Sequence, residues 1–519
     1  MAKARKMRPA GFMAKLVCAL VAVALALTSL FPTAARAEIK HVTKDESFYD
    51  TVFSSENRVG VLLGGLSETE CRERYPNSTL EVYSTLSDLE AALAAGKVDY
   101  ALVPEAMANL YMEANDGFVY YEPQFTSYPS CFAAAKGNTE LVEKVNTVLK
   151  KFREDGTLDQ IYKKWVTDAD YSMDDVPKVE SGETLTVAAM LTEIPYSFVK
   201  DGNYVGSDRE VIERVAYELG MKVEYLDTDF AGGLTAVSSG KADLAIAVTP
   251  NEERAKTMDF TDSYMDLPFS IMGVDPDAKQ AGFIETFEKN FKSTFLDENR
   301  WQMILSGLGV TCLIACFAFV LATLGGAALC AMRRSSRPLA RGFAKTYIKL
   351  ATGIPVLVWL MILYYILFAN VDVSSILVAI ICFGLQASAP MSGIFLTGLE
   401  GVDKGQLEGA LAMGFSKQQA YKMVILPQAA NKVFGLWAGQ LASLIKGTSV
   451  VGYIAITDLT KVSDIIRSRT FQAFFPLIAT ALVYFAIIAL TSWALGLAAK
   501  KTDPKRRSGA SILKGVKTK

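Results

Sequence analysis

The chain has 519 residues, of which 51% are hydrophobic and 21% are charged. It is too long for one ordinary domain, too apolar for a wholly soluble protein and too charged to lie entirely within a membrane. Residues 38–298 carry 24 basic and 48 acidic side chains, whereas residues 299–519 carry 23 and 7. This segregation predicts parts on opposite sides of a membrane and argues against nucleic-acid binding by the acidic part.

Catalytic and metal chemistry have little support in the composition. The single histidine, His41, argues against a histidine-based metal site and against histidine-dependent catalysis. The GxxxxGK[ST] phosphate loop of ATPases does not occur in the sequence. We therefore expect no enzyme activity, no catalytic or metal-binding residues, and no cofactor bound by this chain.

Residues 1–37 have the pattern of an export signal. They contain six Lys or Arg residues and no acidic residue, and an apolar run covers residues 16–27. Ala35 and Ala37 then supply the small residues that a signal peptidase site requires. The pattern predicts a signal peptide and places the chain from residue 38 onward outside the cytoplasm. An uncleaved anchor would leave that part on the same side.

The acidic segment contains two similar stretches, LSDLEAALAAGKVDYALV at 86–103 and FAGGLTAVSSGKADLAIAV at 230–248. Each predicts an amphipathic helix ended by glycine, followed by Lys, a small residue, Asp and a short apolar strand. Glycine suits the left-handed cap of a helix, and the apolar run suits a buried parallel strand. Two βα lobes of similar wiring are therefore expected.

These residues carry a resemblance to a known family. Segment 183–275, with ETLTVAAMLTEIPYSF and TPNEERAKTMDFTDSY, resembles lobe 1 of the polar amino acid binding proteins. Segment 38–168, with NRVGVLLGG and GTLDQIYKKWV, resembles lobe 2 plus the closing helices. The resemblance implies the α/β two-lobed periplasmic-binding-protein fold of type II. Because the lobes come in reversed order, we expect a circular permutation rejoined through a linker at 169–182; two partial copies in tandem are the alternative.

The resemblance also implies a ligand cleft, with five of its residues in lobe 1. Arg254 matches the family's carboxylate-binding arginine, and its planar fork suits bidentate pairing. Thr249 and the Ala247 carbonyl match the place that receives the ligand's ammonium. Tyr196 matches the aromatic residue that packs on the ligand, and Glu193 is placed to meet a positive charge.

Lobe 2 departs from the family pattern. The loop that holds an anion is expected at Gly65 and Ser67, in the stretch Gly-Gly-Leu-Ser. The aspartate that commonly holds the ammonium is replaced by Pro104, and Glu105 beside it is the acidic residue that remains. The resemblance therefore implies a small polar solute, most simply an amino acid, without naming it.

Five apolar stretches follow a linker at 276–299 and predict an all-α membrane domain over 300–498. They lie at 303–331, 346–369, 374–398, 433–456 and 474–498. Basic residues gather between the first two stretches and in the tail at 499–519. By the positive-inside rule both basic groups are cytoplasmic, which leaves residues 38–299 outside the cell membrane.

The predicted cytoplasmic loop at 403–430 contains EGALAMG followed by ILP. It resembles the coupling motif of ATP-driven import permeases, with matches at Glu408, Ala410, Gly414 and Pro427. Together with GLGVTCLIA and KGTSVVGYIAITDLTKVSDIIRSRTFQAFFPL, it makes the membrane segment resemble the polar amino acid permeases. The resemblance implies a separate ATPase subunit that binds ATP and Mg²⁺, and a homodimer formed through the permease domain.

Two classes of function fit two lobes joined to membrane helices. The first is a receptor fused to an ABC importer permease, with the ATPase in another chain. The alternative is a ligand-gated ion channel of glutamate-receptor type, for which the Val-Gly-Tyr at 451–453 is a weak filter-like signal. A channel needs no motor-docking loop, so the sequence favours the importer.

Overall fold

The computed structural model describes residues 39–63, 66–115, 117–179, 182–200, 203–276, 283–369, 371, 373–472 and 474–502. The predicted signal peptide and most of the basic tail lie outside these residues. The chain divides into two compact units. Unit 1 comprises the chain up to Gly307 with two later segments, 365–371 and 452–482, and unit 2 comprises the rest.

Lobe 2 of unit 1 is built on three parallel strands in the order β3-β2-β4. The long strand β14 pairs antiparallel with β4, and β5 and β1 follow beyond it. The elements of this lobe are β1 (His41–Thr43), α2 (Ser47–Val52), β2 (Arg58–Leu62), α3 (Leu66–Arg74), β3 (Thr79–Tyr83), α4 (Leu86–Ala94), β4 (Tyr100–Pro104), α5 (Glu105–Ala114) and β5 (Phe118–Glu122).

Lobe 1 repeats this wiring with its parallel strands in the order β11-β7-β12. The long strand β6 (Thr126–Ala135) pairs antiparallel with β12, and β13 lies beyond it. The elements are β7 (Thr184–Ala189), β8 (Thr192–Glu193), β9 (Ser197–Lys200), β10 (Asn203–Val205), α8 (Ser207–Leu219), β11 (Lys222–Asp227), α9 (Phe230–Ser238), β12 (Leu244–Val248), α10 (Glu252–Ala255), β13 (Met258–Phe260) and β14 (Met265–Val274).

Two long strands connect the lobes, and each starts in one lobe and ends in the sheet of the other. β6 follows the elements of lobe 2 in the chain and completes the sheet of lobe 1. β14 follows the elements of lobe 1 and completes the sheet of lobe 2. β6 and β14 also pair with each other, from Met265 opposite Ser130 to Phe269 opposite Thr126. Therefore neither residues 38–168 nor residues 183–275 form a complete sheet alone.

The predicted internal repeat is visible in the turns that follow α4 and α9. Gly96 and Gly240 have φ values of 64° and 72°, the left-handed conformation that glycine adopts without strain. The carboxylate of Asp99 accepts a hydrogen bond from the Arg58 N–H at 2.8 Å. In lobe 1 the carboxylate of Asp243 accepts from the Thr186 N–H at 2.7 Å. The Asp of each repeat thus joins the turn after its helix to a parallel strand, β2 in lobe 2 and β7 in lobe 1.

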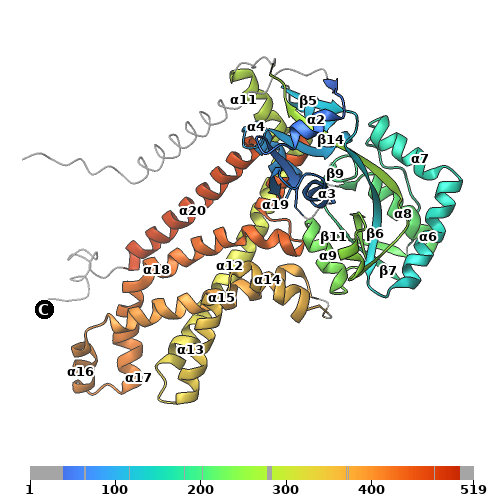
Figure 1. The fold of residues 1–519 in the computed structure, drawn as a ribbon. Helices are drawn as coiled ribbons and strands as arrows, with labels where there is room; N and C mark the ends of the chain where they lie inside the picture. The colour runs from blue at the N-terminus through green and yellow to red at the C-terminus, as the bar shows by residue number, and fades with distance from the viewer. Residues whose placement is uncertain are drawn as a thin grey trace, which may run out of the picture. The chain divides into compact units, whose positions relative to one another are not determined.

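The closing helices α6 (Thr139–Glu154) and α7 (Thr157–Tyr162) pack beside α8 on lobe 1 (Figure 1). Trp165, in the π-helical turn η1 (Lys163–Thr167), is fully buried, and its indole N–H donates to Glu210 at 2.7 Å. Lys164 and Arg214 pair with the same carboxyl group. These buried contacts attach the end of segment 38–168 to lobe 1.

The segment predicted as a second linker is partly helical. It contains α11 (Phe283–Phe291), the π-helical turn η2 (Lys292–Leu296) and the 3₁₀ turn η3 (Asp297–Asn299). Residues 277–282 lie outside the described part.

The segment from residue 300 onward contains α12 (Arg300–Arg333), α13 (Pro338–Gly353), α14 (Val356–Ile362), η4 (Leu363–Leu367), α15 (Ser375–Glu400), α16 (Lys404–Ala412), α17 (Lys417–Ala420), η5 (Tyr421–Ile425), α18 (Leu426–Gly447), η6 (Thr448–Ile454), α19 (Leu459–Thr470) and α20 (Phe475–Thr502). In unit 2, small residues let these helices approach closely. A Cβ placed on Gly384 would lie 2.5 Å from Leu321, and one on Gly326 would lie 2.6 Å from Met391.

The count of membrane spans differs from the five that the sequence predicts. Among the described residues, three helices are long and apolar enough to cross a membrane: 286–333, Ser375–Glu400 and Phe475–Leu497. A fourth span results if α13 and the stretch Val356–Leu367, bent by 104° at their junction, are taken as one. Pro355 explains the bend, because proline disfavours helix in the residue before it. The stretch expected at 433–456 is divided between α18 and the 3₁₀ turn η6, so five spans remain a prediction.

Candidate functional site

A cavity lies between the two lobes of unit 1, and its lining gathers where parallel strands end. In lobe 2 the lining follows the ends of β2, β3 and β4, and in lobe 1 it follows the ends of β7, β11 and β12. The carboxyl ends of parallel strands are the usual place for ligands in α/β folds, because loops and helix starts converge there. The cavity is therefore the candidate solute site.

Arg254 lines this cavity from the short helix α10. The side chain of Asn251 caps the helix by accepting a hydrogen bond from the Arg254 N–H at 2.7 Å. The guanidinium donates to the Thr249 carbonyl at 2.7 Å and lies 5.0 Å from the centre of the Phe230 ring. Burial lowers the pKa of Arg254 from its ordinary value. A partly desolvated cation held this way is suited to bind an anionic group.

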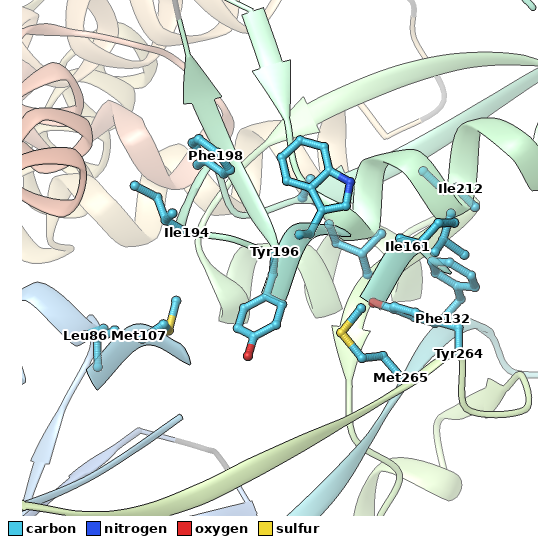
Figure 2. Close-up of a cluster of buried hydrophobic side chains, with 14 of the residues drawn as sticks. Leu86, Met107, Phe132, Ile161, Ile194, Tyr196, Phe198, Ile212, Tyr264 and Met265 are labelled. Carbon is cyan, nitrogen blue, oxygen red and sulfur yellow. The ribbon is translucent and has the colours of Figure 1, made fainter. Parts of the chain in front are cut away.

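Tyr196 lines the cavity from the loop before β9. It is 3% exposed, and within the described residues no partner was found for its buried hydroxyl. In Figure 2 the hydroxyl points into the space between Met107 of lobe 2 and Met265. The ring thus offers an apolar face and a polar tip to a bound molecule.

Two carboxyl groups of lobe 1 line the same cavity. Burial raises the pKa of Glu193 to about 7. Burial also raises the pKa of Asp229, the N-cap of α9, whose carboxylate accepts a hydrogen bond from the Gly232 N–H at 2.7 Å. Carboxyl groups poorly compensated by cations favour a ligand that carries positive charge.

Ala247 and Thr249 also line the cavity, where the pairing of β12 with β6 is irregular. Ala247 has a φ of 57°, a left-handed conformation that costs a non-glycine residue of order 1–3 kcal/mol and occurs preferentially at functional sites. Its N–H donates to the Tyr264 hydroxyl at 3.1 Å. The Thr249 carbonyl accepts from Arg254.

The lobe 2 residues assigned from the sequence have three different outcomes. Ser67, in the first turn of α3, is buried and lines the cavity. Glu105 is absent from the described lining, and its carboxylate accepts a hydrogen bond from Gln124 at 3.2 Å instead. The prediction for Glu105 therefore finds no geometric support. Gly65 lies outside the described residues.

Sequence reasoning missed Asp229, Phe230 and Asp464, which also line the cavity. The internal repeat could have revealed the first two, because Asp229 caps α9 just as Thr85 caps α4, and both capping residues line the cavity. Asp464 lies on α19, more than 200 residues further along the chain, and no pattern in the sequence connects it to the lobes. Among the described residues, no group of three His, Cys, Asp or Glu side chains is arranged to hold a metal ion.

A second candidate site is the loop at 403–430, in unit 2. Glu408 is exposed on α16, and Ala410 of the same helix is buried. Gly414, with a φ of 87°, ends α16, and Ser416 and Gln419 form a capping box that starts α17. Pro427 lies in the first turn of α18, where proline is tolerated. The sequence thus forms the two short helices broken at glycine that the coupling motif predicts.

Apolar side chains are exposed along this loop and the start of α18. Leu411 is 43% exposed, Met413 73%, Met423 63% and Leu426 49%. Arg334 donates to the Tyr421 hydroxyl at 2.8 Å and lies over its ring, so the base of the loop is held to the end of α12. The loop therefore presents an apolar surface on a fixed base.

Comparison with known proteins decides the family. Residues 323–504 match the binding-protein-dependent transport system inner membrane component. The probable amino-acid ABC transporter permease protein YckA of Bacillus subtilis is 32% identical over 201 residues, which are 38% of this chain and 89% of that protein. The chain belongs to this permease family. The putative glutamine transport system permease protein GlnP of Rickettsia typhi is 30% identical over 38% of this chain and 92% of its own length.

The permease also carries a binding domain. Residues 22–168 match the bacterial extracellular solute-binding proteins, family 3. A crystal structure of an amino acid ABC transporter aligns with 43% of this chain and 100% of its own, with 25% identity and a TM-score of 0.38. The chain is thus a fusion of a solute-binding domain with an ABC permease domain, which are extracellular and membrane-embedded respectively. Membership implies an ATPase partner and a small solute, and these relatives give the ion-channel alternative no support.

Proposed function

We propose that this fused permease captures a polar amino acid outside the cell and imports it, while a separate subunit binds and hydrolyses ATP. The observation that carries the proposal is the interlobe cavity, whose lining contains one arginine and several carboxyl groups in the same chain as the permease. This arrangement complements a zwitterion, whose carboxylate and ammonium groups need partners of opposite charge. The names of YckA and GlnP, an amino-acid permease and a glutamine permease, agree with an amino acid solute.

The cavity residues have distinct roles in this proposal. Arg254 pairs with the carboxylate of the solute through its planar fork. Glu193, Thr249 and the Ala247 carbonyl receive the ammonium group, and Tyr196 packs on the hydrocarbon part. Ser67 adds a hydroxyl from the other lobe, so that a bound solute contacts both lobes and favours their closure.

The ATPase subunit docks on the loop at 403–430 and supplies ATP and Mg²⁺. Glu408 and the exposed apolar residues of the loop are the proposed contacts, and Gly414 gives the turn its shape. This chain itself holds no cofactor in the proposal. Two copies pair through the permease domain, as the resemblance to import permeases implies.

The binding domain is proposed to be a circular permutant. The support is the wiring of the sheets, because β6 and β14 exchange between the two halves and the closing helices pack on lobe 1. Two separate partial copies would each need strands from elsewhere. Fusion to the permease keeps the receptor close, at an effective concentration of about millimolar for a short tether.

Solute-stimulated ATP hydrolysis tests this function. The full chain is reconstituted in nanodiscs with its ATPase subunit, and hydrolysis is measured with each of the common amino acids. We expect stimulation by a subset of them, loss of that stimulation in Glu408→Ala, and unchanged solute binding by the same variant. If no amino acid binds or stimulates, the proposed solute class is wrong. A current through planar bilayers that depends on the solute but not on ATP would instead support a channel.

A further inference from the structure

One residue that lines the solute cavity belongs to the segment that matches the permease family. Asp464 lines the cavity and lies on α19, within the residues 323–504 that match the permease family. α19 belongs to unit 1 together with both lobes. The side chain of Asp464 is 36% exposed, so a molecule in the cavity can reach it.

α19 is held to both lobes by ion pairs. Near its start, Lys461 lies 3.3 Å from Asp227 of lobe 1, and both side chains are nearly buried. One and a half turns later, Arg467 pairs with Asp88 of lobe 2 at 2.7 Å and donates to the Ser87 carbonyl at 3.2 Å. Asp464 lies between these two ion pairs on α19.

The charges of the lining are unevenly distributed. The described lining residues of lobe 2 carry no charged side chain, whereas lobe 1 contributes Arg254, Glu193 and Asp229. With Asp464 the lining holds three carboxyl groups and one guanidinium. Arg467 compensates Asp464 in part, at 3.3 Å, but it also serves the shorter pair with Asp88.

We propose that Asp464 is a solute-contacting residue and that, with Asp229 and Glu193, it selects amino acids that carry a second positive charge. The proposal rests on the proposed function and names its solute class. Arg254 takes the carboxylate of such a solute, and the three carboxyl groups take its two cationic groups. The segment that matches the permease family thereby contributes directly to recognition.

The state of the carboxyl groups supports this selection. Desolvation raises the pKa of Asp464 and of Asp229, and Arg467 and Lys461 lower that of Asp464 less than burial raises it. Ionised carboxylates with too few cations around them are costly, and a cationic solute relieves that cost while a neutral or acidic one does not. A basic amino acid therefore gains more from this lining than glutamine does.

Two matched variants of the full chain in nanodiscs test the proposal. Asp464→Asn and Asp88→Asn each remove one carboxylate partner of Arg467, but only Asp464 lines the cavity. Binding of lysine, arginine, glutamine and glutamate is measured by calorimetry. We expect the unmodified chain to bind lysine or arginine about tenfold or more tighter than glutamine, since a charged hydrogen bond contributes this much.

The outcomes separate the two proposals. Asp464→Asn is expected to weaken binding of the basic amino acid about tenfold and that of glutamine less than threefold. Asp88→Asn leaves both affinities within about threefold, and Asp464→Glu restores part of the preference. Equal losses in Asp464→Asn and Asp88→Asn would overturn the inference, because Asp464 would then only position α19. Equal binding of lysine and glutamine by the unmodified chain would overturn it too, while leaving the proposed function intact; binding of no amino acid would remove both.

Discussion

At the scale of single residues, Arg254 is the side chain that we propose to recognise the carboxylate of the solute. Replacing it with lysine keeps the charge but loses the planar fork and the contact with Phe230. We expect Arg254→Lys to weaken amino acid binding by about 10- to 100-fold in calorimetry. Arg72→Lys, at an exposed pair on α3, is the matched control and keeps normal affinity. Normal affinity in Arg254→Lys would show that another group holds the carboxylate.

Two buried acids predict how stability depends on pH. Burial raises the pKa of Asp208 to about 8 and that of Glu193 to about 7. An unfolded chain releases these protons near about pH 4, so between about pH 4 and 8 the folded protein binds more protons. Stability of unit 1 therefore falls as pH rises through this window and is highest, for these two groups, below it.

Asp208→Asn removes one of these protons and is expected to flatten the fall. The measurement is the thermal unfolding midpoint of the full chain in detergent, recorded between about pH 5 and pH 8. Asp175→Asn removes an exposed carboxylate and serves as the control. An unchanged pH slope in Asp208→Asn would mean that Asp208 is ionised in the folded protein.

The sequence could predict cavity residues only where a local sequence motif also determines where those residues lie in the fold. Arg254, Thr249, Ala247, Tyr196 and Glu193 belong to one lobe, whose local folding brings their segments together. Asp464 could not be predicted, because α19 reaches the lobes through contacts between segments that are far apart in the chain. Glu105 is not among the described lining residues, because being next to Pro104 does not fix the direction of a side chain at the start of a helix.

At the scale of elements, two of the glycines in the loop at 403–430 have opposite requirements. Gly409 lies inside α16, and nothing lies within 4 Å of the place where its Cβ would be. Gly409→Ala is therefore expected to stabilise the helix by about 1 kcal/mol. Gly414 also has open space, but its φ of 87° strains any other residue.

Replacing Gly409 or Gly414 with alanine is expected to change the stability of the chain in opposite directions. Gly409→Ala raises the thermal midpoint of the full chain and keeps coupled ATP hydrolysis, whereas Gly414→Ala costs about 1 kcal/mol and lowers coupling. Thermal unfolding and solute-stimulated hydrolysis are measured on both variants. If Gly409→Ala destabilised the chain, the contacts of α16 in the assembled transporter would differ from those described.

Elements were predictable where one pattern determines them. The repeat of Gly, Lys and Asp predicted the turns at Gly96 and Gly240, because glycine at a helix end has a specific backbone role. The membrane spans were less predictable, since hydropathy measures apolar length but not continuity. Pro355 bends one predicted span, and the helix of another ends at Gly447.

At the scale of the whole molecule, the exchange of β6 and β14 predicts that the linker at 169–182 is dispensable as a covalent connection. A protease site inserted after the exposed Lys178 is cleaved in the purified full chain. We expect the two fragments to remain together and to bind solute within about threefold of the uncut protein, because each completes a sheet of the other. Separation of the fragments in size-exclusion chromatography would contradict the permuted wiring.

The most direct test of the central claim is uptake into proteoliposomes that contain this chain and its ATPase subunit. Radiolabelled amino acid is supplied on the side of the binding domain, and ATP and Mg²⁺ are supplied on the opposite side. The account predicts accumulation against a gradient that requires ATP and is lost in Glu408→Ala and Arg254→Lys. Solute that merely equilibrates across the membrane, or that enters equally without ATP, would contradict it.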